Sequence, residues 1–206
     1  MPSLQEQFGP IDIYLFDQLL KRRITTGMRI LDTGCGGGRN LVYFLREGYA
    51  VYAVDQDAQA VESVRALARA IVPALPESNF RMEAMEQMSF DDAFADVVIN
   101  SAILHFARDD AHFDSMLDGA WRVLTPGGLF FCRLASTIGM EKQIERIQGR
   151  RYKLPDGSER YLVDEALLAS HTSRLGAELA DPLKTTVVQN QRAMTTWVLW
   201  KNKTDG

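Results

Sequence analysis

The chain has 206 residues, a formal net charge of -4, an apolar fraction of 46% and a charged fraction of 24%. This length suits one domain over residues 1–206, and the composition is globular rather than disordered or collagen-like. The acidic balance excludes nucleic acid as a main partner, and no apolar run reaches the roughly 20 residues that cross a bilayer, so we expect no membrane partner.

The first 27 residues predict a helical cap. Leu15 and Leu19 recur at helical spacing ahead of the first strand, and we expect this helix to pack over one end of a sheet. Tyr14 and Phe16 lie on the same helix. They either close over a ligand as a lid or belong to the core face of the helix.

From residue 28 onward, short apolar runs rich in branched residues alternate with helical patterns, which is typical of a parallel sheet covered on both faces. The expected strands are 28–32, 50–55, 79–85, 96–101 and 128–134. The helices between them are expected at 39–47, 57–71 and 110–124, the second beginning at an N-cap, Asp57.

Beyond the fifth strand the pattern changes. Residues 140–148 predict a helix, KLPDGSER a turn-rich loop, and residues 163–175 another helix. The β-branched run 193–200 and the segment 183–189 predict a closing hairpin, which adds an antiparallel edge. We therefore expect an α/β, Rossmann-like sheet of seven mostly parallel strands with helices on both faces.

The stretch ILDTGCGGGRN, from Ile30 to Asn40, predicts a nucleotide-binding loop because glycines directly after a strand let a ligand lie against the backbone. A dinucleotide pattern GxGxxG from Gly34 needs a third glycine where Arg39 stands, so that interpretation survives only as a degenerate match. No GK[ST] follows the first glycine, which excludes a Walker-type phosphate loop.

What fits is an acid followed by alternate glycines. Asp32 precedes Gly34, Gly36 and Gly38, and AVDQD places Asp55 at the end of the second strand. In these motifs the sequence resembles the class I S-adenosylmethionine-dependent methyltransferases. ADVVINSAILHF and WRVLTPGGLFFCRL extend the resemblance, and the GRN continuation and size are similar to those of small bacterial enzymes of the ubiquinone-biosynthesis and tellurite-resistance type.

The resemblance implies S-adenosyl-L-methionine as cofactor and assigns roles to particular positions. Asp55 would hold the ribose hydroxyls, Asp32 would orient the methionine end, and the backbone of Met85 would contact adenine. Relatives usually carry an acid beside the adenine contact, whereas this chain has Ala84 there. The expected cofactor-binding residues are Tyr14, Asp32, Gly34, Cys35, Gly36, Asp55, Gln56, Met85 and Asn100.

One histidine is the candidate catalytic residue. His105 follows the fourth strand, at the carboxyl end where such sheets bind ligands, and would act as a general base on a hydroxyl or amine. The alternative is a packing histidine in the apolar run AILHF. We expect no metal, because the spacing of four neighbouring polar residues fits no metal-binding pattern and the acids suit a helix N-cap: His105, Asp109, Asp110 and His112.

Cysteine usage and the N-terminal sequence indicate the compartment. Cys35 and Cys132 are far apart in sequence and fit neither a disulfide framework nor a metal site, so a reducing cytoplasm is expected. The N-terminal stretch carries acidic residues and no basic region before an apolar block, unlike a secretory signal.

We therefore predict methyl transfer to a small-molecule acceptor by in-line displacement, in a monomer or homodimer. A cofactor-binding regulatory protein without turnover and a nucleotide-dependent oxidoreductase are the alternatives. The acceptor cannot be derived, because its specificity lies in the variable segment 135–175, on the expected substrate side.

Overall fold

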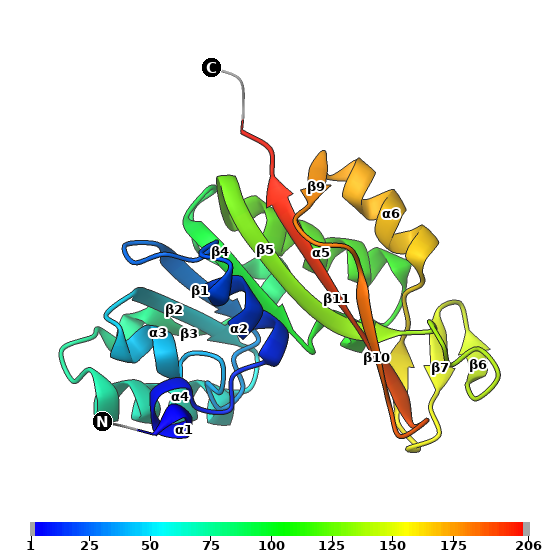
Figure 1. Cartoon of the computed structure of the whole chain (residues 1–206), viewed down its shortest axis with the longest axis horizontal. Helices are drawn as coiled ribbons and strands as arrows, with labels where there is room; N and C mark the ends of the chain where they lie inside the picture. The colour runs from blue at the N-terminus through cyan, green and yellow to red at the C-terminus, as the bar shows by residue number, and fades with distance from the viewer. Residues whose placement is uncertain (1–2, 204–206) are drawn as a thin grey trace.

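A mixed sheet of eight strands forms the centre of the computed structural model, which describes residues 3–203 (Figure 1). From edge to edge its main path is β3 (Phe80–Met82), β2 (Ala50–Asp55), β1 (Arg29–Thr33), β4 (Ala95–Ser101), β5 (Leu124–Ser136), β11 (Arg192–Lys201) and β10 (Lys184–Val188). The first five strands are parallel, whereas β11 is antiparallel to both β5 and β10. The predicted mostly parallel sheet with an antiparallel edge is thus confirmed.

The eighth strand was not predicted. β9 (Ala177–Leu179) pairs with the last residues of β11, while β10 pairs with its first half. A strand of three residues carries too little period-two pattern to be recognised in a sequence, and only its pairing with β11 defines it.

Helices cover both faces of the sheet, as expected. One face carries α2 (Ile13–Leu20), α3 (Val42–Arg46) and α4 (Ala58–Ile71), and the other carries α5 (Asp110–Val123) and α6 (Glu165–Arg174). A short helix, α1 (Leu4–Phe8), rests on α3 through stacked rings of Phe8 and Tyr43. Each face has its own apolar core, and Phe44 and Phe113 are fully buried in the two clusters. Burying such a side chain contributes roughly 1.5–3 kcal/mol.

Two predicted elements are shorter than expected because the chain turns inside them. The helix predicted at 39–47 begins only at Val42, since the N–H groups of Gly38 and Leu41 donate to the carbonyls of Cys35 and Gly38 and form successive turns. The third strand ends at Met82 and is followed by a single 3₁₀ turn, η2 (Met85–Gln87). The N-cap predicted for α4 is present, because Asp57 accepts the N–H of Gln59.

The helix predicted at 140–148 is wrong. Residues 145–148 form β6 (Glu145–Gln148), which joins β7 (Arg151–Lys153) and β8 (Glu159–Tyr161) in a small antiparallel sheet. KLPDGSER is the hairpin between β7 and β8. The helical spacing of apolar residues here reflects a separate contact, in which Ile144 and Tyr152 pack on Ala135, Leu154 and Leu162. Tertiary packing has overridden local periodicity.

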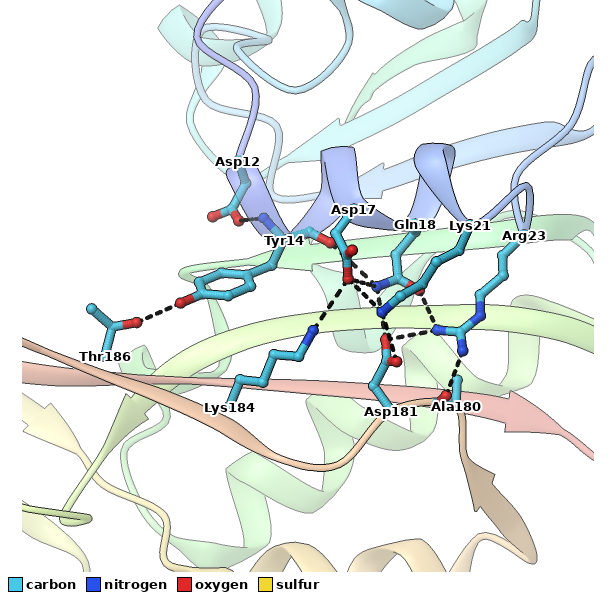
Figure 2. A network of polar contacts seen from close by, with 10 residues as sticks. All are labelled: Asp12, Tyr14, Asp17, Gln18, Lys21, Arg23, Ala180, Asp181, Lys184 and Thr186. Atoms are coloured by element: carbon cyan, nitrogen blue, oxygen red, sulfur yellow. Dashed lines mark hydrogen bonds and ion pairs between the residues drawn. The ribbon is translucent and has the colours of Figure 1, made fainter.

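The N-terminal helix is attached through Asp181 to the connection between β9 and β10 (Figure 2). Its carboxylate accepts hydrogen bonds from Gln18 Nε2 at 2.9 Å, Lys21 Nζ at 2.8 Å and Arg23 Nη1 at 2.6 Å. Burial by itself would raise the pKa of Asp181, but these hydrogen bonds outweigh it and lower the pKa to about 2. The network joins segments about 160 residues apart in sequence, so α2 is fixed against the sheet edge.

Replacing Asp181 with Asn should lower the free energy of unfolding by about 1–3 kcal/mol, because its cationic partners lose a charged acceptor that is only 11% exposed. Denaturant unfolding at neutral pH measures the loss. Asp92→Asn is the matched control, since Asp92 pairs with Arg122 but is 80% exposed, and should cost less than ~0.5 kcal/mol. Equal losses in the two variants would contradict a structural role for the network.

Candidate active site

Two cavities open beside the carboxyl ends of the parallel strands, where ligands bind in open α/β sheets. Each encloses about 300 Å³. The first cavity is lined by residues that follow β1, β2, β3 and β4 and by α5: Thr33, Gly34, Val54, Asp55, Gln56, Glu83, Ala84, Met85, Glu86, Ile103, Phe106, His112 and Met116.

The glycine loop needs its three alternate glycines for three different reasons. Gly34 has φ +138°, and a Cβ there would collide with the side chain of Ile103. At Gly38, φ +76°, a Cβ would lie 2.8 Å from Leu67 and 2.9 Å from Val64, so this glycine lets the loop pack on α4. Gly36 has φ +48° and open space in front of its Cα. The loop is therefore packed at both ends and free in the middle.

Asp55 is held at the end of β2 by backbone donors. Its Oδ2 accepts the N–H of Gly36 at 3.0 Å and its Oδ1 accepts the N–H of Asp57 at 3.0 Å. Because each carboxylate oxygen can accept more than one hydrogen bond, both oxygens keep acceptor capacity toward the cavity. The arrangement suits a ligand that presents two neighbouring hydroxyls.

Asp32 is a buried acid without a full set of partners. The residue is 2% exposed, and its Oδ1 has no hydrogen-bond partner among the described residues. Burial raises the pKa of Asp32 to about 7, with the positive charge of Arg39 lowering it and the charge of Asp55 raising it further. A buried acceptor left unsatisfied is costly, so this position calls for a donor from a ligand or ordered water.

The segment after β3 is held against α5. A Cβ at Gly119 of α5 would collide with the carbonyl oxygen of Met85, so the helix and this backbone touch directly. Glu86 Oε1 lies 3.3 Å from His112 Nε2, and His112 Nδ1 accepts the N–H of Arg108. These contacts fix Met85 and Glu86 at the edge of the first cavity.

The second cavity lies on the other side of the 3₁₀ turn η3 (Leu104–Phe106), and Phe106 lines both cavities. Ala102, with the left-handed φ of 67°, turns the chain between β4 and η3. The lining combines the end of β5 with two hairpins, β7–β8 and β10–β11: Arg39, Ala102, His105, Phe106, Arg133, Ala135, Leu154, Asp156, Ser158, Arg160, Val188, Arg192 and Met194.

His105 is 7% exposed on this second lining. Its Nδ1 accepts the N–H of Ala135 at 3.2 Å, so the neutral imidazole carries its proton on Nε2. Burial, together with the positive charges of Arg160 and Arg192, lowers the pKa of His105 to about 4. At neutral pH this side chain therefore offers the cavity a hydrogen-bond donor.

Residues 31–132 match the family model described as a methyltransferase domain. An uncharacterised methyltransferase of Synechocystis is 34% identical over 107 residues, which are 52% of this chain and 47% of the relative. The ubiquinone biosynthesis O-methyltransferase of Chelativorans is 28% identical over 142 residues, covering 66% of this chain and 52% of the relative. The chain thus spans about half the length of these curated relatives.

A solved structure shares the fold. The 1,6-didemethyltoxoflavin-N1-methyltransferase of Burkholderia thailandensis, solved with 1,6-didemethyltoxoflavin and S-adenosylhomocysteine, superposes with a TM-score of 0.69 at 18% identity and covers 97% of this chain and 80% of its own. Residues 31–132 thus form a methyltransferase domain, whose relatives include S-adenosylmethionine-dependent methyltransferases. The resemblance stated from its motifs is confirmed.

The predicted site residues fall into three groups. Four of them line the first cavity: Gly34, Asp55, Gln56 and Met85. His105 lines the second cavity. The remaining five line neither cavity: Tyr14, Asp32, Cys35, Gly36 and Asn100.

Two residues of the last group have side chains engaged elsewhere. The Tyr14 hydroxyl is 2.6 Å from Thr186 Oγ1 on β10 (Figure 2), which places the side chain against the hairpin rather than over the first cavity. Asn100 is fully buried and donates to Thr33 Oγ1 at 3.0 Å and toward Met85 Sδ at 2.8 Å. Asn100 thus connects β4 to β1 and η2 from behind the cavity.

The cysteines and the candidate metal set have structural contacts. Burial raises the pKa of both thiols, and neither Cys35 nor Cys132 forms a disulfide. Asp109 caps α5 by accepting the N–H of His112, as predicted, and Asp110 accepts the hydroxyl proton of Tyr161. Among residues 3–203, no group of three or more His, Cys, Asp or Glu side chains is placed to hold a metal ion. In the same part of the chain, no helix has the length and apolar character needed to cross a membrane.

Sequence reasoning missed several lining residues. Ile103 and Phe106 lie in the run AILHF, which was interpreted only around its histidine. Arg160 and Arg192 lie in segments predicted as turns or their flanks, where charged residues are expected on any surface. A count of arginines near the predicted substrate-side turns is the one signal that would have found them.

Asp32→Asn tests the buried acid. The folded-state pKa of Asp32, about 7, lies above the ordinary 3.8. The wild type therefore loses stability as the pH rises from about 4 to about 7, because Asp32 ionises at a lower pH in the unfolded state than in the folded state. Relative to the wild type, the variant should therefore gain stability over this window, by an amount on the order of 3–4 kcal/mol. Ligand-free unfolding at pH 4, 5, 6, 7 and 8 measures it. Exposed Asp91→Asn is the control, and a flat difference for Asp32→Asn would refute the assignment.

His105 should titrate near pH 4 and carry its neutral-state proton on Nε2, as ¹H–¹⁵N NMR of the imidazole can determine. Replacing both Arg160 and Arg192 with Gln should raise the pKa of His105, because two positive charges that disfavour the imidazolium are removed. A wild-type pKa of 6 to 7, or a proton on Nδ1, would contradict this arrangement.

Proposed function

We propose that this chain transfers the methyl group of S-adenosyl-L-methionine to a small-molecule acceptor bound in the second cavity. The observation that carries the proposal is the pair of cavities on either side of η3, which both reach Phe106. One carries the cofactor motifs of the family, and the other is a separate space of similar size for an acceptor. Small-molecule sites in proteins begin at about this volume.

The residues in and around the first cavity fit the cofactor, although Asp32 and Gly36 lie outside its lining. Asp55, oriented by two backbone N–H groups, would accept from the ribose hydroxyls, and the backbone of Met85 would meet adenine. Asp32, with its unsatisfied Oδ1, would take a hydrogen bond from the methionine end, directly or through water. Open space at Gly36 allows close passage of the ligand. The cofactor supplies a methyl group already activated by its sulfonium, so the chain mainly has to orient the acceptor, which can contribute roughly 7–11 kcal/mol.

His105 would position the acceptor rather than take its proton. A general base needs a free lone pair, whereas Nδ1 of His105 already accepts the N–H of Ala135 and Nε2 holds the proton. The Nε2–H can instead donate to an oxygen of the acceptor. The general-base role predicted for His105 stays a prediction. The role proposed from its geometry is that of a hydrogen-bond donor that orients the acceptor.

Other finer properties are also proposals. The β7–β8 hairpin, which lies inside the variable segment 135–175, would confer acceptor specificity because it lines the second cavity. A cytoplasmic location is supported by two buried free cysteines, and the net charge of -4 speaks against nucleic acid. A monomer or a homodimer is compatible with this site, since both cavities are formed within one chain.

S-Adenosylhomocysteine should raise the melting temperature of the protein, whereas NAD should not. At a ligand concentration of 100 times Kd the native state gains about 2.7 kcal/mol. Protection by NAD and none by S-adenosylhomocysteine would favour the oxidoreductase alternative instead.

Asp55→Asn should weaken S-adenosylhomocysteine binding at least ~10-fold in calorimetry, because one charge-assisted acceptor is lost. Asp91→Asn serves as the exposed control.

A further inference from the structure

The second cavity is basic although the protein as a whole is acidic. Its lining contains four arginines, and one carboxylate, Asp156, lies among them. The whole chain has a net charge of -4. A local excess of one sign against the overall charge focuses a field on ligands of the opposite sign.

The inner two arginines share a single acid. Asp12, whose side chain is 0% exposed, lies 2.8 Å from Arg133 Nη1 and 3.6 Å from Arg39 Nη2. Arg39 also donates to Ser101 Oγ, and among the described residues the buried Nε of Arg133 has no hydrogen-bond partner. One carboxylate shared by two arginines therefore leaves a net positive charge at this end of the cavity.

The outer two arginines lie near one acid, Asp156, but do not pair with it. In the part of the chain that the structure describes, neither Arg160 nor Arg192 forms an ion pair within 4.0 Å. Arg160 lies over the ring of Phe106, 4.7 Å from its centroid, and donates to the carbonyl of Glu159. Asp156 Oδ1 accepts the hydroxyl proton and the N–H of Ser158, and these hydrogen bonds, together with the charges of Arg192 and Arg160, hold the pKa of Asp156 below its usual range.

These charges surround an apolar floor. Leu154 and Met194 line the cavity and pack in the small cluster beneath the β6–β8 sheet. The two hairpins meet here, as the neighbouring yellow and red segments at the end of the β10–β11 hairpin show in Figure 1. Each hairpin brings one arginine, Arg160 from β8 and Arg192 from β11.

We propose that the acceptor is a small carboxylate with an apolar body, recognised by Arg160 and Arg192. This inference rests on the proposed function, because it takes the second cavity as the acceptor site. A planar guanidinium matches a carboxylate with two parallel hydrogen bonds, and the Nε2–H of His105 supplies a further donor. The apolar floor formed by Leu154 and Met194 contacts the rest of the molecule.

The test first measures S-adenosylhomocysteine binding by calorimetry, and failure there would refute the proposed function itself. With S-adenosylhomocysteine at saturation, benzoate, benzamide and inorganic phosphate are then titrated while the His105 imidazole signals are followed by NMR. Benzoate should produce a saturable shift, and benzamide, its uncharged analogue, should bind at least ~10-fold more weakly because it lacks the charge that guanidinium recognises.

The double variant R160Q/R192Q should raise the Kd for benzoate at least ~10-fold without changing the affinity for S-adenosylhomocysteine. R22Q/R46Q, which removes two exposed arginines elsewhere, is matched in net charge and should leave both affinities unchanged. Equal binding of benzamide, no saturable shift with benzoate, or an equal loss in the control would overturn the proposal. Tighter binding of phosphate than of benzoate would overturn the choice of carboxylate.

Discussion

The buried carboxylate of Asp12 connects the parts on which both cavities depend. Its Oδ1 caps α2 by accepting the N–H of Tyr14, and its Oδ2 accepts from Arg133 on β5. Its own backbone N–H donates to Asn40, directly after the glycine loop. A fully buried charge is tolerated only when it is paired and hydrogen-bonded, so these three segments must come together for the chain to fold. The N-cap of the N-terminal helix thus supports two arginines that line the second cavity, although the helix itself lines neither cavity.

This connection also explains why the GRN continuation of the loop belongs to the site. Arg39 shares Asp12 with Arg133 and reaches Ser101 at the end of β4, while Asn40 receives the Asp12 N–H. The residue that replaces the third glycine of a dinucleotide motif is therefore in use. It connects the glycine loop to the end of β4 and places a positive charge on the lining of the second cavity.

The sequence was sufficient to predict those features that depend on neighbours along the chain. Apolar runs placed the five parallel strands, and the glycine motif with its following acid identified Gly34 and Asp55, because strand, loop and acid occupy one β–α–β unit. Contacts across the chain were not predictable. Asp12 and Arg133 are 121 residues apart, and nothing in the local pattern of either indicates the other.

The same distinction explains where the structure departs from local pattern. Residues 140–148 have helical spacing, yet Ile144 packs in a separate cluster with Ala135 at the end of β5, which local periodicity does not report. For Tyr14 the leading helix suggested either a lid over the ligand or a core position. Its actual partner, Thr186, lies on the last hairpin, whose position depends on how β11 adds to β5.

The distribution of charge across η3 gives the two cavities opposite preferences. The acidic residues that line the first are Asp55, Glu83 and Glu86, whereas the second has four arginines and one acid. The acidic residues of the first cavity would therefore attract the positively charged methyl donor. The arginines of the second cavity would attract an anionic acceptor. Because like-charge contact costs several kcal/mol, the acidic residues proposed to hold the cofactor would disfavour an anionic acceptor in the first cavity. Selectivity between the two sites then follows from the sign of the charge on each wall, without requiring cavities of different size.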